Sequence, residues 1–176
     1  GDRVAFLSAA DQPGEIRLLD VATRRHRVLA RVPSDARALV FNAWSAADDR
    51  IVVRLWRADG SQAMAALSAD TGALDVLFDF PAVPQGFARS PDGRLVAFDA
   101  PQGSDRPERD IQVCDLTSRE CATVAPHPAH DFFPVWSPDG RLLFDSDRAG
   151  PLGLWSVELA GLQAAAQPTL VRDTGR

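Results

Sequence analysis

Short apolar runs alternate with clusters of turn-forming residues along the whole chain. The runs are rich in Val, Leu, Phe and Trp, and turn residues separate them every 8–12 positions. This spacing predicts short β-strands, and the 13 prolines and 12 glycines leave little room for helices. The one stretch with helix-forming composition, residues 159–167, lies between two predicted strands. The pattern therefore predicts an all-β protein.

A repeated motif divides these strands into similar units. Ser90-Pro91-Asp92-Gly93 and Ser137-Pro138-Asp139-Gly140 each join two apolar runs, and their serines lie 47 residues apart. Pro sets φ at the first corner, Asp bonds to nearby backbone and Gly accepts a positive φ, so the chain reverses there. A weaker copy, Trp44-Ser45 with Asp48-Asp49, lacks Pro and Gly. The strand after each turn carries a large apolar residue at intervals of 47, 45 and 46: Phe6, Val53, Phe98 and Phe144.

Four predicted strands per unit of roughly 45 residues are typical of a β-propeller blade. The predicted blades cover approximately residues 1–35, 36–81, 82–127 and 128–176, all within one propeller domain over residues 1–176. The first blade lacks its leading strand, which gives fifteen strands in all. The segment from Gly93 to Phe98 is one residue longer than that from Gly140 to Phe144. We expect the turn to absorb this residue, for instance through a bulge, because a slip would invert the side chains of the strand.

The fourth unit carries the clearest family resemblance. Residues 135–150, Val-Trp-Ser-Pro-Asp-Gly-Arg-Leu-Leu-Phe-Asp-Ser-Asp-Arg-Ala-Gly, and Leu154-Trp155-Ser156-Val157 resemble the TolB-type propeller repeat, a relative of the WD repeat. Similar blades occur in TolB, in tricorn protease, in prolyl-oligopeptidase-family peptidases and in bacterial sensor or regulator proteins. The resemblance is strong over residues 87–159 and weaker over residues 1–86.

The resemblance also bears on the number of blades. TolB-type propellers usually have six or more, so it implies that the four predicted blades are part of a larger propeller. A closed ring of four blades and a homodimer of two half-rings that completes one propeller are the alternatives.

The composition limits the function. A net charge of −5 argues against binding nucleic acid through this domain. No apolar run approaches the roughly 20 residues that span a bilayer, so no membrane span is expected. The chain opens Gly1-Asp2-Arg3-Val4 without a signal peptide and reads as a piece of a longer protein. The sequence has no nucleotide-binding glycine loop, no zinc motif and no Gly-x-Ser-x-Gly elbow, so we expect neither a cofactor nor an enzyme.

One local group of imidazoles and a carboxylate stands out: His127-Pro128-Ala129-His130-Asp131, in the connection between the third and fourth blades. A metal site here would need further ligands from another loop. Acid–base catalysis would need a nucleophile, and none is nearby. A contact with a protein partner or small ligand is the functional interpretation of His127, His130 and Asp131, because rim loops commonly carry function. The structural alternative is that Asp131 bonds neighbouring backbone and both histidines are solvated.

Two further groups have mainly structural interpretations. Asp147 and Arg148 follow a strand and are expected to form a surface ion pair, since the spacing of a calcium loop is absent. The four tryptophans could stack on a sugar or peptide, but packing between blades is favoured: Trp44, Trp56, Trp136 and Trp155.

The two cysteines flank a predicted hairpin turn. Cys114 ends one strand and Cys121 opens the next, so a hairpin that pairs Asp115 with Glu120 places the cysteines opposite each other. A disulfide is then geometrically possible and would indicate an oxidising compartment. The alternative is that both are small apolar residues that face each other. On this basis a periplasmic location is favoured over a cytoplasmic one.

Taken with the resemblance, these features favour a non-catalytic, TolB-like propeller module that binds a protein partner or a small ligand. It could be the sensor part of a bacterial regulator or an envelope protein. The alternative is a propeller that gates a prolyl-oligopeptidase-type serine peptidase, whose catalytic domain would be encoded outside these residues.

Overall fold

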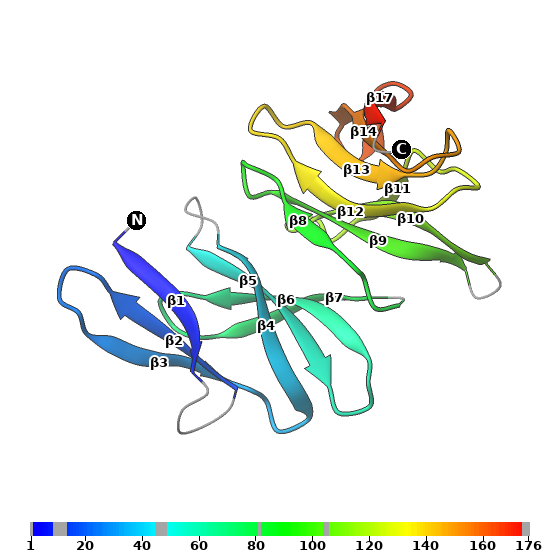
Figure 1. Ribbon diagram of the computed structural model, residues 1–176. Coiled ribbons are helices and arrows are strands. Elements are labelled where there is room, and N and C mark those ends of the chain that lie inside the picture. Colours follow the sequence, from blue (N-terminus) through cyan, green and yellow to red (C-terminus); the bar gives the residue numbers. More distant parts are fainter. Residues whose placement is uncertain (1, 9–13, 45–48, 81, 104–105, 174–176) are drawn as a thin grey trace. The chain divides into compact units, whose positions relative to one another are not determined.

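A computed structural model describes residues 2–8, 14–44, 49–80, 82–103 and 106–173 (Figure 1). Its contacts divide the chain into two compact units, residues 1–80 and 81–176. The described residues contain strands and turns and no helix, which confirms the all-β prediction. It follows that they contain no helix long and apolar enough to cross a membrane.

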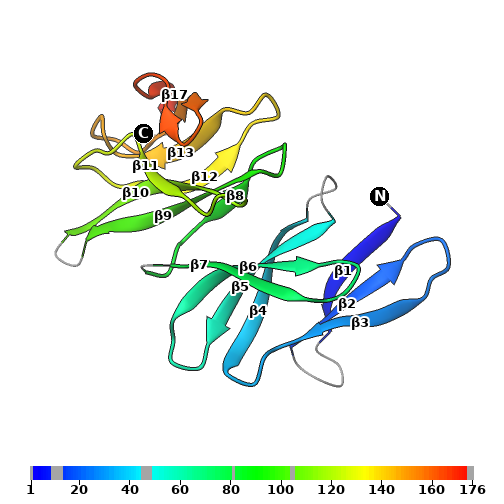
Figure 2. The ribbon, with the colours of Figure 1, turned by 180° about the vertical axis from the view of Figure 1, so that it is seen from behind.

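The first unit holds two antiparallel sheets, each a simple meander (Figures 1 and 2). The first sheet has three strands in chain order: β1 (Arg3–Ser8), β2 (Glu15–Asp20) and β3 (His26–Arg31). The second has four: β4 (Ala36–Trp44), β5 (Arg50–Arg57), β6 (Gln62–Ser68) and β7 (Leu74–Asp79). This is the blade pattern predicted for the first half of the chain.

The second unit holds two four-stranded antiparallel sheets and one small hairpin. The third sheet consists of β8 (Phe87–Arg89), β9 (Leu95–Gly103), β10 (Arg106–Asp115) and β11 (Cys121–Val124). The fourth consists of β12 (Asp131–Trp136), β13 (Leu142–Ser146), β14 (Gly153–Val157) and β17 (Thr169–Asp173). The hairpin of β15 (Leu159–Ala160) and β16 (Gln163–Ala164) was not predicted, so the described residues contain seventeen strands instead of fifteen.

The Ser-Pro-Asp-Gly turns have the predicted chemistry. In each, the serine hydroxyl lies 2.5 Å from the aspartate carboxylate, and the glycine has a positive φ of 75° at Gly93 and 87° at Gly140. The turn also absorbs the extra residue of the third unit, because the main chain of Ser90 pairs with Leu95, whereas that of Ser137 pairs with Arg141. The strands that follow therefore stay in equivalent register, as expected.

Each unit has its own apolar core, formed where two sheets face each other. In the first unit Ile16, Leu18 and Leu29 pack with a set from the second sheet that includes Ile51 and Val53. In the second unit the third sheet contributes Ala97, Ile111, Val113 and Val124. The fourth sheet contributes Leu142, Phe144 and Val157 to the same core. The partly buried Trp136 and Trp155 pack against this core. Trp44 similarly packs against the core of the first unit, while Trp56 stays 40% exposed.

Candidate functional site

The candidate residues of the second unit gather where the first strands of its sheets begin. In an antiparallel meander the start of the first strand lies beside the end of the second and the start of the third. Register places Asp131, at the start of β12, opposite Ser146, at the end of β13. The end of the connection 125–130 joins them, because the main-chain N–H of His130 bonds to the carboxylate of Asp147 (2.8 Å). We call this edge of the second unit the first-strand rim.

A buried ion pair lies beneath this rim. Asp131 is fully buried, and its Oδ2 lies 2.7 Å from the guanidinium of Arg148, whose side chain is only 8% exposed. The guanidinium also lies over the rings of Phe144 and Trp155, at 5.1 and 5.3 Å from their centroids. Arg148 thus pairs with Asp131 inside the protein, which corrects the prediction of a surface ion pair between Asp147 and Arg148. The faces of these two rings attract the guanidinium and help to offset the cost of burying its charge.

The carboxylate of Asp131 is incompletely satisfied. Among the described residues its Oδ1 has no hydrogen-bond partner. Burial raises the pKa of Asp131 to about 6, and the nearby charge of Asp110 adds to this, although Ser146 and Arg148 act in the opposite direction. The low-dielectric surroundings disfavour the charged form more than a single guanidinium favours it. Asp131 therefore supports the rim from inside and is not exposed to contact a partner.

The two histidines lie in the connection above this pair, and both are half-buried. The Nδ1 of His127 accepts the main-chain N–H of Ala129 (3.1 Å), and the main-chain N–H of His127 bonds to Asp110 (3.3 Å). The ring of His130 stacks on Phe132 with centroids 5.2 Å apart, and its Nδ1 has no partner among the described residues. No group of three His, Cys, Asp or Glu in the described part of the chain is arranged to hold a metal ion.

Phe133 is the rim residue that sequence reasoning missed. It has a left-handed backbone with φ of 48°, and it lies at a bulge where the pairing of β12 with β13 shifts between Phe132 and Val135. This conformation is costly for an aromatic residue. Its side chain is nevertheless 51% exposed. The run Phe132-Phe133-Pro134 gives only a weak signal for this, because Pro in a strand often marks an edge or a bulge.

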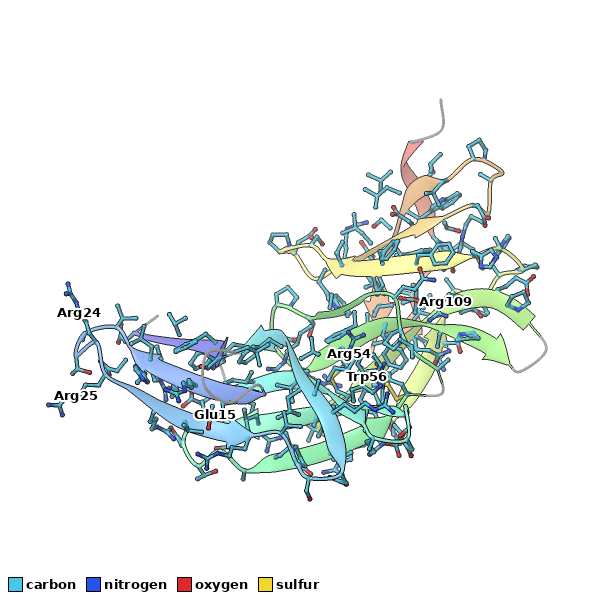
Figure 3. All side chains as sticks on the ribbon, turned by 60° about the horizontal axis from the view of Figure 1, so that its bottom comes forward. Glu15, Arg24, Arg25, Arg54, Trp56 and Arg109 are labelled. Atoms are coloured by element: carbon cyan, nitrogen blue, oxygen red, sulfur yellow. A yellow bond between two sulfur atoms is a disulfide. The ribbon has the colours of Figure 1, made fainter. Side chains whose placement is uncertain are left out.

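The corresponding place in the third sheet is occupied by Gly86 and has a different support. A Cβ added to Gly86 would lie 3.0 Å from the Cα of Phe133, so a side chain there would collide with the backbone of the fourth sheet. The main-chain N–H groups of Gln85 and Gly86 bond to the buried carboxylate of Asp99, at 3.2 and 2.7 Å. Arg109, labelled in Figure 3, completes this site with its Nε 2.5 Å from the same carboxylate.

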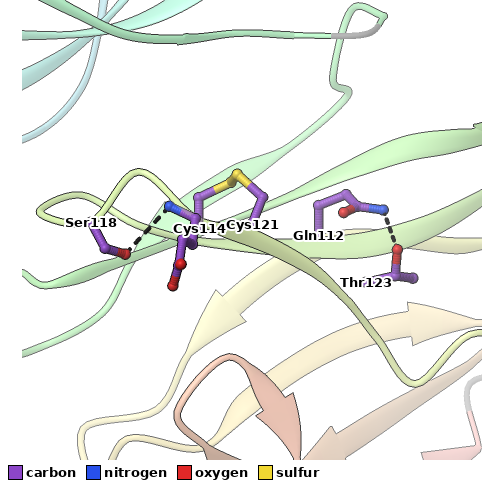
Figure 4. The surroundings of a disulfide bond; sticks show 6 residues. Gln112, Cys114, Ser118, Cys121 and Thr123 are labelled. Carbon is purple, nitrogen blue, oxygen red and sulfur yellow. Dashed lines mark hydrogen bonds between the residues drawn. A yellow bond between two sulfur atoms is a disulfide. The ribbon is translucent and has the colours of Figure 1, made fainter.

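The cysteines lie away from this rim, beside the turn after β10. Register pairs Cys114 with Cys121, next to a main-chain hydrogen bond from Asp115 to Glu120, and the structure contains a disulfide between them (Figure 4). Their Cα atoms are 4.1 Å apart, as expected for a pair of facing residues without main-chain hydrogen bonds between them. Cys114 is fully buried, whereas Cys121 is exposed.

No protein-family model matches this sequence, and no curated protein matches it. Its fold is similar to that of several solved propellers. TolB from Acinetobacter baumannii is 21% identical with a TM-score of 0.65, over 93% of this chain and 41% of TolB. An oligogalacturonate lyase in complex with manganese is 18% identical with a TM-score of 0.68, over 90% of this chain and 46% of the lyase.

Tricorn protease is similar over a smaller part of its length. It is 17% identical with a TM-score of 0.68, over 90% of this chain and 17% of the protease. The chain thus spans less than half the length of each of these three proteins. At these identities the similarity establishes the β-propeller fold, like that of TolB, and does not extend to an activity.

Proposed function

We propose that this chain is a non-catalytic propeller module that binds a protein partner through the first-strand rim of its second unit. The observation that carries the proposal is Phe133, an exposed aromatic residue held in a strained backbone conformation. Strain of this kind persists where the surrounding structure imposes it, and it is concentrated at functional sites. An aromatic side chain fixed in this way is a suitable anchor for a partner.

The neighbouring groups suit support and contact rather than catalysis. Asp131 and Arg148 are buried and bound to each other, so neither is available to a substrate. In the connection 125–130, His127 and His130 are half-buried, and Pro126 and Pro128 are exposed. We therefore assign the contact with the partner protein to this connection and to Phe133. A small ligand in place of a protein would need an enclosed pocket, and the described rim offers an exposed side chain instead.

The test uses a displayed peptide library selected on the immobilised protein. Peptides that bind are labelled, and their affinity is measured by fluorescence anisotropy for the wild type, Phe133→Gly and His130→Ala. Gly keeps the left-handed backbone while removing the ring, so we expect at least tenfold weaker binding with unchanged folding. Val21→Ala, at a 48% exposed residue of the first unit, is the control and should bind as the wild type does. Equal affinity for wild type and Phe133→Gly would contradict the proposal.

A propeller that gates a serine peptidase is the second candidate. It is favoured by the similarity to a prolyl endopeptidase and to a puromycin hydrolase, of which this chain covers 22% and 30%, respectively. The catalytic domain would then be in the same polypeptide, outside these residues. Labelling of the native protein from its source with a fluorophosphonate probe tests this, and a labelled band that contains this sequence would replace the first candidate.

We further propose an oxidising location, the periplasm in a bacterial envelope or sensor protein, because the cysteine pair closes a disulfide. Closing so short a loop contributes roughly 2–3 kcal/mol to the free energy of unfolding. Thiol labelling of the protein extracted without reductant should therefore detect no free cysteine, and two after reduction. Two free thiols before reduction would contradict the location.

A further inference from the structure

A cavity of about 330 Å³ lies within the second unit, between the two Ser-Pro-Asp-Gly turns and the hairpin of β15 and β16. The turns follow β8 and β12, which are neighbours in the second unit (Figure 1), so the cavity lies at the opposite end of the first strands from the first-strand rim. The lining residues that decide its chemistry are Asp92, Arg94, Trp136, Asp139 and Leu159.

The hairpin is an addition to the blade pattern that supplies one wall of this cavity. In the third sheet residues 116–120 join the last two strands, whereas residues 158–168 do so in the fourth. Leu159 and Leu162 of this longer connection pack against the core of the second unit. The main-chain N–H of Ala165 also bonds to the carbonyl of Glu158 (2.8 Å), which closes the base of the hairpin. The wall is therefore anchored, as in binding sites that are formed before the ligand arrives.

Trp136 contributes an indole that is held in place. Its Nε1 donates a hydrogen bond to the main-chain carbonyl of Ala88 in the neighbouring sheet (3.2 Å), and the half-buried ring packs against the core. The side chain lines the cavity from this fixed position. The face of an indole attracts cations more strongly than that of any other aromatic side chain.

Two aspartates give the cavity negative charge. Hydrogen bonds from the Ser90 hydroxyl and the main-chain N–H of Arg94 hold the pKa of Asp92 below its usual value. The hydroxyl of Ser137 likewise lowers the pKa of Asp139. Both carboxylates are therefore charged at neutral pH, and both residues are exposed, so a ligand can reach them.

The arginines of the third sheet's turn are engaged elsewhere. Arg94 lines the cavity, but its Nε lies 2.7 Å from the carboxylate of Asp115 at the end of β10. The Nε of Arg89, which precedes the turn, donates to the main-chain carbonyl of Gly93 (2.7 Å). The positive charge beside the cavity is thus already bound to protein groups.

The fourth sheet repeats this arrangement. Arg141 binds Glu158, and its Nε lies 3.6 Å from Asp139. Over both turns four carboxylates accompany three arginines: Asp92, Asp115, Asp139 and Glu158 with Arg89, Arg94 and Arg141. This surplus of negative charge repels anions and attracts cations.

We propose that the cavity binds a guanidinium group, which donates to the carboxylates of Asp92 and Asp139 and lies against the indole of Trp136. A guanidinium fits better than an ammonium because it is planar, stacks on aromatic faces and presents several donors in a fixed fork. The group can belong to an arginine side chain of a peptide or to a small free guanidine. The cavity is separate from the first-strand rim, so the protein contact proposed there and this site are tested independently.

NMR titration of the isotopically labelled protein with N-acetyl-arginine amide tests the proposal, with the indole N–H signals as the readout. Trp136→Phe assigns the signal of Trp136, which should shift saturably. The signal of Trp56, which is 40% exposed in the first unit, is the internal control and should not shift. N-acetyl-citrulline amide has nearly the same shape without the charge, so it should cause no saturable shift.

Substitution of the aspartates connects this signal to the cavity. Asp92→Asn and Asp139→Asn keep an oxygen acceptor for the serine hydroxyl and remove the charge, so each should weaken binding by about fivefold. Asp70→Asn, the same substitution at a carboxylate that is 74% exposed in the first unit, is the control and should bind as the wild type does. The NMR spectra themselves verify that each variant folds.

Three results would overturn the proposal: no saturable shift of Trp136, an equal response to the citrulline compound, or unchanged affinity in either aspartate variant. N-acetyl-lysine amide that binds as tightly as the arginine compound would also overturn the assignment to a guanidinium. Agmatine and the peptide acetyl-Gly-Arg-Gly-amide then separate the two sources. Tighter binding of the peptide indicates an arginine side chain, and tighter binding of agmatine indicates a free guanidine.

Discussion

Asp99 in the third sheet and Asp131 in the fourth are both completely buried. Each forms an ion pair with an arginine, at the edge of its sheet where the first strand begins. Their remaining partners differ. Asp99 also accepts two main-chain N–H groups, from Gln85 and Gly86. The Oδ2 of Asp131 accepts a hydrogen bond from Arg148, while its Oδ1 has no partner among the described residues.

The difference follows from the backbone near the start of each first strand. Gly86 has no side chain, so the third sheet's chain can pass close to both Asp99 and the neighbouring β12. In the fourth sheet the equivalent residue is Phe133, whose bulge directs the ring outward. The same place in the repeat thus has two amide groups bound to a buried carboxylate in the third sheet and an exposed aromatic side chain in the fourth.

The largest effect is expected for Asp99→Ala. The substitution removes the buried carboxylate that binds the Nε of Arg109 and two main-chain N–H groups, which should lower the free energy of unfolding by about 3–5 kcal/mol. Urea unfolding followed by tryptophan fluorescence measures it. Asp70→Ala is the control, because its carboxylate is 74% exposed beside Arg3 and should cost at most about 1 kcal/mol. Equal losses would refute the contrast.

The second prediction concerns pH and Asp131→Asn. The pKa of Asp131 is raised to about 6 in the folded protein, above its unfolded value, so the folded state binds more protons between these values. The stability contributed by this group is therefore present at low pH and is lost as pH increases through 6. The advantage of the wild type over Asp131→Asn should decrease from pH 4 to pH 7 by up to about 3 kcal/mol.

Parallel urea titrations of both proteins at several pH values provide this measurement. The matched control is Asp70→Asn, the same substitution at a carboxylate that is 74% exposed. A pH-independent difference for Asp131→Asn would show that the incomplete satisfaction of Asp131 has no energetic consequence.

Gly86→Ala tests the close approach of the two first strands. Its Cβ would lie 3.0 Å from the Cα and 3.1 Å from the Cδ1 of Phe133, and the backbone atom cannot rotate away. We expect a loss of about 1–3 kcal/mol in the free energy of unfolding. Gly140→Ala, whose Cβ would meet nothing within 4 Å, controls for the change of residue type, although its φ of 87° adds strain of its own. A neutral Gly86→Ala would mean that the strands can separate.

The smallest effect is expected at Phe133 itself. Gly accepts a φ of 48° readily, whereas a β-branched residue does not. Phe133→Gly should therefore be more stable than Phe133→Val by about 1–2 kcal/mol, by thermal or urea unfolding. The reverse order would indicate that the bulge relaxes when the ring is lost.

The local pattern of residues was sufficient to predict the sheets and their turns. Ser90 and Ser137 occupy equivalent positions, and the glycines that follow have the positive φ that the motif requires. These features depend on neighbours within a few residues, so the sequence contains the necessary information. The hairpin at residues 159–164 escaped prediction because its two-residue strands have no distinctive periodicity.

The rim could be located from the sequence only in part. The segment from His127 to Asp131 was identified by its composition, but its role in binding stays a prediction. The partner of Arg148 was predicted wrongly, because Asp131 lies seventeen residues away and only the register of β12 with β13 brings them together. The exposure of Phe133 similarly depends on a bulge against a strand that the local sequence does not specify.

Local residue patterns fix the all-β architecture, the repeat and the positions at which the chain reverses, since each follows from alternation and turn chemistry over a few residues. The partner of each buried carboxylate and the exposure of the Phe133 ring become visible only in the folded chain. These outcomes depend on packing between segments distant in the chain, where burial sets the balance between charge, hydrogen bonding and strain.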